Sequence, residues 1–222
     1  SDIKRVIERF DLHCLNGRSI LVTGGLGLIC SSVVDLLVMY NECHNADVKI
    51  YIAARNKQLF EERYGVYPYI KYINYDATKP INFDFRVDYI IHGAGVASPE
   101  LYVAKPVETM LSNFNGVLNL LKYAKNNNAR RMLYISSSEV YGSKITEDSF
   151  EESQFGSIDI NSIRSSYSES KRASEVLCKA YSSEYNVDTV IVRPGHIYGP
   201  TASPKDKRVS SCLLYTSDAA DD

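Results

Sequence analysis

Tyr167 and Lys171 have the residue types and the spacing for a proton transfer. A separation of four residues places two side chains one turn apart on the same face of a helix. A tyrosine hydroxyl ordinarily has a pKa of about 10, and a nearby ammonium group lowers that pKa because it stabilises the phenolate. Such a tyrosine can take the proton of an alcohol while a hydride leaves the same carbon. The pair therefore predicts oxidation of a hydroxyl group, and the alternative is a chance pair on an exposed helix.

A second chemical signal is the glycine-rich segment Thr23–Cys30 (TGGLGLIC), which directly follows an apolar run. The first turn of a helix offers unpaired N–H groups and the positive end of the helix dipole, and both suit a pyrophosphate. Glycine lets the backbone turn sharply and approach a phosphate without a Cβ clash. The contacts that we expect for a dinucleotide in this turn are Gly24, Gly27, Leu28 and Ile29. A glycine turn without a ligand is the alternative.

These two signals must be positioned by strands and helices. Apolar runs typical of buried parallel strands lie at residues 19–23, 48–54, 69–75, 87–92, 131–136 and 189–193. Helical patterns lie at residues 1–15, 28–40, 57–64, from Pro106 into the run Asn126–Asn128, and at 166–185. The polar stretch 147–162 predicts a surface loop. This alternation is typical of βαβ units around a parallel sheet.

The second expected strand ends in Ala53-Ala54-Arg55-Asn56, without the acid that usually holds an adenosine ribose. An arginine at this point can pair with the 2′-phosphate of NADP. Arg55 therefore leaves NADP open beside NAD, and a surface arginine without a cofactor contact is an equal alternative.

Four motifs follow one another in a familiar order. Thr23–Cys30 resembles TGxxGxxG, Ser136–Gly142 resembles an active-site segment that ends in VYG, Tyr167–Lys171 is YxxxK, and Arg193–Pro200 resembles RxxNxYGP. From Ser19 to Pro200 the chain thus resembles the extended short-chain dehydrogenases/reductases of the NAD-dependent epimerase/dehydratase family. Cys30 replaces the third glycine of the first motif, and His196 replaces the asparagine of the last. The resemblance implies an α/β fold with a Rossmann-type doubly wound parallel sheet.

The resemblance also implies roles for individual residues. Ser137 would hydrogen-bond the reacting hydroxyl group, Tyr167 would be the base and Lys171 would lower its pKa. NAD is the implied cofactor, and a nucleotide sugar is the implied substrate. Further cofactor contacts are expected from Asp76, Ala77, His92, Ala94, Tyr167, Lys171 and Arg193, with His92 itself structural rather than catalytic. Substrate contacts are expected from Ser98, Ser138 and His196.

Three short segments indicate which reaction of this family to expect. Ser138-Glu139-Val140-Tyr141-Gly142, Arg164–Tyr167 (RSSY) and Ala97-Ser98-Pro99 look most like UDP-glucuronate decarboxylases. Glu139 would then be catalytic, handling protons or orienting the sugar, or else it is a solvated carboxylate at a strand end. A dehydratase would have an aspartate at position 138, so the serine disfavours dehydration. A UDP-sugar 4-epimerase and a non-catalytic NAD(P)-binding regulator remain as alternatives.

Composition sets broader limits. The 222 residues carry 25 basic and 27 acidic side chains, which does not suggest a nucleic-acid or membrane-surface partner. No apolar run approaches the ~20 residues of a membrane span. The five scattered cysteines lack metal-ligand spacing, so no metal site is expected, and they suit a reducing, cytoplasmic location.

The domain plan places a leading helix at 1–18 and an NAD(P)-binding domain, incomplete at its C-terminus, at 19–211. Residues 212–222 (CLLYTSDAADD) resemble a translated sequencing adapter, and we expect them to be a foreign tail. In the resembled family a C-terminal substrate domain follows, and we expect it to be missing here. A homodimer is expected for the full-length protein.

Overall fold

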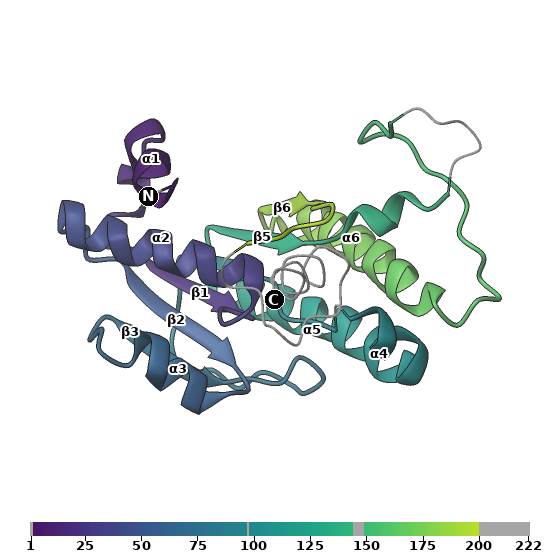
Figure 1. Ribbon diagram of the computed structural model, residues 1–222, viewed down its shortest axis with the longest axis horizontal. Coiled ribbons are helices and arrows are strands. Elements are labelled where there is room, and N and C mark those ends of the chain that lie inside the picture. The colour runs from purple at the N-terminus through teal and green to yellow at the C-terminus, as the bar shows by residue number, and fades with distance from the viewer. Residues whose placement is uncertain (1, 97, 144–148, 200–222) are drawn as a thin grey trace, which may run out of the picture.

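The computed structural model describes residues 2–96, 98–143 and 149–199. Ala97, Pro200, the first residues of the expected loop 147–162 and the expected tail 212–222 lie outside the described residues. A parallel sheet with the strand order β3-β2-β1-β4-β5-β6 forms the centre of the molecule (Figure 1). This order is that of a doubly wound Rossmann-type sheet, so the predicted fold class is confirmed. The strands are β1 Ser19–Thr23, β2 Lys49–Ala54, β3 Ile70–Asn74, β4 Tyr89–His92, β5 Arg131–Ile135 and β6 Thr189–Val192.

The helices follow the expected pattern, with two additions. They are α1 Asp2–Arg9, α2 Leu28–His44, α3 Lys57–Tyr64, α4 Pro99–Ala104, α5 Pro106–Asn127 and α6 Ser165–Tyr185, with 3₁₀ turns η1 His13–Leu15 and η2 Ser138–Tyr141. Sequence analysis did not predict α4 or η2. Pro99 opens α4, where its missing N–H costs nothing because a helix leaves its first N–H groups unpaired. α2 continues four residues beyond the predicted end and stops at Asn45, which has a left-handed conformation.

The core consists of two layers, one on each face of the sheet. Ile20, Val22, Ile50 and Ile52 pack with residues of α2 and α3, which include Val34, Leu37 and Phe60. Leu21, Ile90, Met132 and Tyr134 pack with residues of α5 and α6, which include Leu120, Leu121 and Cys178. Successive side chains of a strand point to opposite faces, so a sheet covered on both faces needs continuous apolar runs. This is why the strands read as unbroken apolar segments in the sequence.

The strand order reverses beside β1, which pairs with β2 on one side and with β4 on the other. In such sheets a crevice opens at the carboxyl ends of the two strands at the reversal, because their connections leave in opposite directions. The glycine turn follows β1 and the segment Gly93–Gly95 follows β4, so both lie at this crevice. The fold thereby brings together two segments that are about seventy residues apart in the chain.

Candidate dinucleotide-binding and catalytic site

The glycine turn is held by backbone contacts. Gly24 has φ +70°, and a Cβ at this position would lie 2.9 Å from the carbonyl carbon of Gly93 and from the amide nitrogen of Ala94. The N–H of Gly24 donates to the carbonyl of Ala53 at 2.9 Å, and the N–H of Gly27 donates to the carbonyl of Gly24 at 2.8 Å. Glycine is therefore required at position 24, both for conformation and for space.

α2 begins directly after this turn, with Gly27 as its N-cap and without a side-chain hydrogen bond at the cap. An N-terminus without a side-chain cap can offer its first N–H groups to an anion. A close turn with this helix start fits the pyrophosphate of a dinucleotide. Leu28 and Ile29, both half-buried, are the first two residues of the helix.

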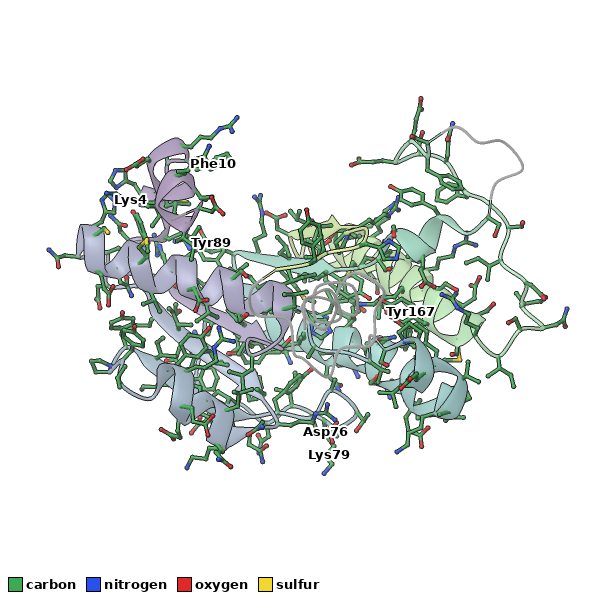
Figure 2. All side chains as sticks on the ribbon, in the orientation of Figure 1. Lys4, Phe10, Asp76, Lys79, Tyr89 and Tyr167 are labelled. Carbon is green, nitrogen blue, oxygen red and sulfur yellow. The ribbon has the colours of Figure 1, made fainter. Side chains whose placement is uncertain are left out.

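Asp76, Ala77 and Arg55 lie near the ends of β3 and β2. The Asp76 carboxylate accepts hydrogen bonds from the N–H and the hydroxyl of Thr78 at 3.0 and 2.8 Å. These bonds, with smaller contributions from Lys79 and Arg55, hold the pKa of Asp76 below its ordinary value. Figure 2 shows Asp76 and Lys79 close together at the lower edge of the view. Arg55 is exposed and close enough to act on Asp76 electrostatically, so the two side chains share one edge of the expected adenosine site.

His92, the last residue of β4, contacts Thr23, the last residue of β1. Its Nδ1 lies 2.6 Å from the Thr23 hydroxyl oxygen, which in turn accepts a hydrogen bond from the Ala94 N–H at 3.3 Å. Burial, with a smaller contribution from Lys171, lowers the pKa of His92 to about 3, so the imidazole is neutral. A buried neutral ring of this kind supports the ends of β1 and β4 through its contact with Thr23.

Tyr167 and Lys171 lie on α6, and both are buried, with 7% of each residue exposed. The Lys171 ammonium donates to the carbonyl of Ile135 at 2.9 Å, and it lies 4.8 Å from the ring centroid of Tyr134 and 5.9 Å from that of Tyr167. Burial lowers the pKa of Lys171 to about 8, and Glu175 opposes this shift. The structure thus places a buried cation next to the ring of the expected base, as the YxxxK spacing predicts.

Ser137 and Glu139 lie between β5 and α6. The Ser137 hydroxyl accepts a hydrogen bond from the Glu139 N–H at 3.2 Å and so caps η2. The Glu139 carboxylate accepts two hydrogen bonds from Arg164, at 2.8 and 3.0 Å, in a bidentate pair. Arg164 therefore fixes the position of the Glu139 carboxylate, and this ion pair connects η2 to the residue before α6. Ser138 donates its N–H to the carbonyl of Pro194 at 2.9 Å.

Sequence analysis missed Tyr102. Its ring, on α4, stacks on the ring of Tyr167 with 4.2 Å between centroids and an interplanar angle of 7°. Burial, Tyr167 and Glu139 all raise the pKa of Tyr102, so its hydroxyl stays protonated. The missed signal was Ser98-Pro99-Glu100, a helix start with proline in the first turn and an acid beside it, which would have placed Tyr102 on a helix.

Arg193 makes contacts that the sequence did not predict. Its guanidinium binds the buried Glu175 through three hydrogen bonds of 2.7 to 3.2 Å, donates to the carbonyl of Glu152 at 3.0 Å and lies 4.8 Å from the ring centroid of Tyr141. A buried carboxylate needs such a partner. The Arg193 side chain therefore supports α6 and β6, and the cofactor contact that we expected of Arg193 stays a prediction.

The remaining expected residues, Ser98, Ala77 and His196, are half-buried or exposed. Ser98 is the half-buried N-cap of α4. Ala77 lies against α5, because a Cβ added to Gly116 would be 3.2 Å from the Cβ of Ala77. His196 is exposed on the segment after β6. This segment returns toward the glycine turn, because a Cβ on Gly199 would lie 3.6 Å from the Leu28 side chain.

No helix among the described residues is both long and apolar enough to cross a membrane.

Comparison with known proteins places the chain in a family. The NAD dependent epimerase/dehydratase family matches residues 20–219, a range that includes most of the expected tail. The chain is 36% identical over 201 residues to UDP-glucuronic acid decarboxylase 5 of Arabidopsis thaliana, covering 90% of this chain and 57% of the relative. It is 34% identical over 197 residues to UDP-glucuronic acid decarboxylase 1 of Xenopus tropicalis, covering 89% of this chain and 45% of the relative. The chain thus spans about half the length of these curated relatives.

Solved structures share the fold. One of them is UDP-N-acetylglucosamine 4-epimerase of Methanobrevibacter ruminantium, in complex with UDP-N-acetylmuramic acid. It superposes with a TM-score of 0.77 at 25% sequence identity, and the superposition covers 92% of this chain and 64% of the epimerase chain. Another is UDP-glucuronic acid 4-epimerase of Bacillus cereus, solved with UDP-glucuronic acid and NAD. It has a TM-score of 0.75 at 21% sequence identity, and the superposition covers 90% of this chain and 63% of the epimerase chain. The prediction of NAD as the cofactor agrees with the family's description. With its doubly wound sheet, its glycine turn and a match over residues 20–219, the chain belongs to the NAD dependent epimerase/dehydratase family.

Proposed function

We propose that the protein to which this chain belongs is an NAD-dependent enzyme that decarboxylates UDP-glucuronate. The observation that carries the proposal is the pair of Glu139 and Arg164 at the start of α6, next to the stacked rings of Tyr102 and Tyr167. A carboxylate held in place by a guanidinium can exchange a proton with a bound sugar and accept hydrogen bonds from its hydroxyl groups. The names of the relatives support the same reaction.

The chain's own residues supply binding and proton transfer. When bound, NAD accepts a hydride from a sugar carbon. Tyr167, as a phenolate that Lys171 stabilises, takes the proton of the hydroxyl on that carbon, and the Ser137 hydroxyl hydrogen-bonds the reacting oxygen. The resulting keto group sits β to the sugar carboxylate, so carbon dioxide can leave. Glu139 handles the proton that replaces the lost carboxylate on the sugar carbon, while Tyr102, kept protonated, can donate a hydrogen bond. Tyr167 then gives its proton back to the keto oxygen as the hydride returns to the same carbon, so the net change is the loss of carbon dioxide.

The cofactor site follows the strand ends. We assign the pyrophosphate to Gly24, Gly27, Leu28 and Ile29, the adenosine to Asp76 and Ala77, and the nicotinamide side to His92, Ala94, Tyr167 and Lys171. Ser98, Ser138 and His196 are assigned to the substrate. Arg55 keeps the 2′-phosphate of NADP open as an alternative, and comparing the Kd of NAD and NADP by calorimetry decides between them.

The test uses the full-length protein with NAD and UDP-glucuronate, and the products are weighed by mass spectrometry. Loss of the mass of carbon dioxide establishes the decarboxylase, and a Tyr167→Phe variant controls for contaminating activity. A product of unchanged mass with inverted stereochemistry by NMR contradicts the decarboxylase and supports the second candidate, a UDP-sugar 4-epimerase, which the likeness to the Methanobrevibacter epimerase favours. Binding of NAD without turnover of UDP-glucuronate or UDP-glucose supports a non-catalytic regulator.

A homodimer is part of the proposal. α5 exposes Val107, Met110 and Leu111 at 64, 45 and 47% of their surfaces, and the neighbouring α6 exposes Val176 at 66%. Exposed apolar residues gathered on two packed helices suit a second copy of the same surface, as two-fold symmetry requires. Sedimentation of the full-length protein should give a dimer, and Met110→Glu should shift it to a monomer. The cytoplasmic location stays a prediction.

A further inference from the structure

The thiol of Cys30 occupies the space that a side chain at position 93 would need. Cys30 lies in the first turn of α2 and is 3% exposed. A Cβ added to Gly93 would collide with the sulfur of Cys30, whereas its next nearest neighbour would be the Cδ1 of Ile135 at 3.2 Å, the end of a flexible side chain. Among the described residues, the sulfur of Cys30 is therefore the one atom that a Cβ at position 93 would meet closer than 3.2 Å.

Gly93 is also confined from its other side. A Cβ on Gly24 would lie 2.9 Å from the carbonyl carbon of Gly93. The N–H of Gly93 donates to the carbonyl of Thr23 at 3.1 Å, which fixes the end of β4 against the end of β1. The carbonyl carbon of Gly93 thus lies close to the glycine turn, and a Cβ at position 93 would point at the thiol of Cys30, while the rest of Gly93 is exposed.

The chemical state of Cys30 suits a packing role. Burial raises the pKa of its thiol to about 12, although Lys171 acts in the opposite direction, so the thiol is neutral and unreactive near pH 7. A buried neutral cysteine behaves as a small apolar side chain. Cys30 belongs to the same buried cluster as Ile135, whose carbonyl accepts the hydrogen bond of Lys171. Packing is therefore continuous from the glycine turn to the catalytic lysine.

We infer that Cys30 and Gly93 form a size-matched pair in which the thiol fills the place of a side chain at position 93 and sets the distance between the dinucleotide turn and the end of β4. Cys30 is then a positioning residue for the cofactor. The inference rests on the proposed dinucleotide binding, and it explains how the chain accommodates a residue larger than the third glycine of the TGxxGxxG pattern. The larger residue at position 30 is compensated by a residue without a side chain at position 93.

The test is a double-mutant cycle in the full-length protein with Gly93→Ala, Cys30→Ala and the double variant. Cys30→Ala removes only the colliding sulfur, and Gly93 has an ordinary φ, so alanine is conformationally allowed there. We expect Gly93→Ala to weaken NAD binding about tenfold and to lower the melting temperature, and the double variant to recover most of both losses. The matched control is Cys178→Ala/Gly93→Ala, because Cys178 is equally buried but packs in the cluster on the other face of the sheet. This control should not recover either loss.

The two readouts separate the inference from the proposed function. Melting without cofactor tests the pair even if the protein binds no dinucleotide, whereas calorimetry of the wild type with NAD tests the function itself. Losses that simply add in the double variant would overturn the pair, as would an unaffected Gly93→Ala variant. If Gly93→Ala does not fold, the double variant is compared with Cys30→Ala, and a double variant that melts well below Cys30→Ala contradicts the pair.

Discussion

The proposed dinucleotide end and the proposed catalytic end of the crevice are held together by different kinds of contact. At the dinucleotide end, between β1, α2 and β4, close contacts join backbone atoms and small residues, with Gly24 against Gly93 and Gly93 against Cys30. At the catalytic end, between η2, α6 and β6, side chains of opposite charge are paired, as in Glu139–Arg164 and Glu175–Arg193.

A third arginine strengthens this contrast. Arg172, on α6, donates to the carbonyls of Val140, Tyr141 and Gly156 at 2.6, 3.3 and 2.9 Å. Three arginines thus fasten the irregular segment around η2 to the catalytic helix. A pyrophosphate is bound by N–H groups that every residue carries, so its site depends on the path and volume of the chain. Proton transfer depends on particular titrating groups, so its site must hold charges. We expect the dinucleotide end to be sensitive to added volume and the catalytic end to lost charge or lost hydroxyl groups.

The largest expected effect is at the catalytic end. Tyr167→Phe removes the hydroxyl group that we propose takes the substrate proton and keeps the ring that stacks on Tyr102. We expect kcat to fall about 10³-fold while the Kd of NAD changes less than about threefold. Rapid-mix kinetics and calorimetry on the full-length protein measure the two quantities. An equal loss in NAD affinity would show that the two ends are not separate.

Loss of a buried charge at the catalytic end should destabilise the fold. Glu175→Gln leaves the Arg193 guanidinium without the carboxylate that it binds, and Glu175 is only 5% exposed. We expect the free energy of unfolding to fall by about 3 kcal/mol in urea titrations. Glu169→Gln is the matched control on the same helix, since Glu169 forms a longer, more exposed pair with Arg172 at 3.6 Å, and it should cost less than about 1 kcal/mol. Similar losses in both variants would remove the distinction between buried and surface charge.

Added volume should matter most at the dinucleotide end. Gly24→Ala brings a Cβ to within 2.9 Å of backbone atoms of Gly93 and Ala94, whereas Gly17, with φ +65°, has nothing within 4 Å of an added Cβ. Both variants carry the strain of a positive φ, so their difference isolates the collision. We expect Gly24→Ala to lose about 1–3 kcal/mol more unfolding free energy than Gly17→Ala, and about tenfold in NAD affinity. Equal effects of the two variants would show that conformation, not volume, limits the turn.

The smallest expected effect is a pH dependence at Lys171, whose pKa is lowered to about 8 by burial. Above that pH the ammonium that we propose stabilises the Tyr167 phenolate is lost, so kcat should decline by up to about tenfold per pH unit. Stability should move the other way. The unfolded chain binds this proton more tightly, so the group's contribution to the free energy of unfolding rises between about pH 8 and the ordinary pKa of 10.5. A kcat that stays constant from pH 7 to 10 would contradict this assignment.

Much of the fold could be predicted because its signals are local. Residues 19–23 form β1 and residues 57–64 form α3 with the predicted bounds, since an apolar run and an amphipathic pattern each report on neighbouring residues. The short helix α4 and the turn η2 were missed because elements of six and four residues give almost no periodic signal. Tyr102 was missed together with α4.

Partners across the fold were the least predictable part of the site. Arg193 lies in a motif that suggested a cofactor contact, yet its side chain binds Glu175, eighteen residues earlier in the chain. Glu139 could be read as a solvated carboxylate until the fold placed Arg164 against it. Both partners come from a different element than the residue they bind, so no spacing rule connects them.

The amino-acid sequence by itself determined the order of strands and helices, the glycine turn after the first strand and the shared helix face of Tyr167 and Lys171. Each of these depends on conformational preferences and side-chain periods within a few residues. The tertiary structure alone decided which distant residues meet, as in Gly93 with Cys30, Tyr102 with Tyr167 and Glu175 with Arg193. The physical reason is that these contacts depend on strand order and on packing across the sheet, which place segments side by side irrespective of their separation along the chain.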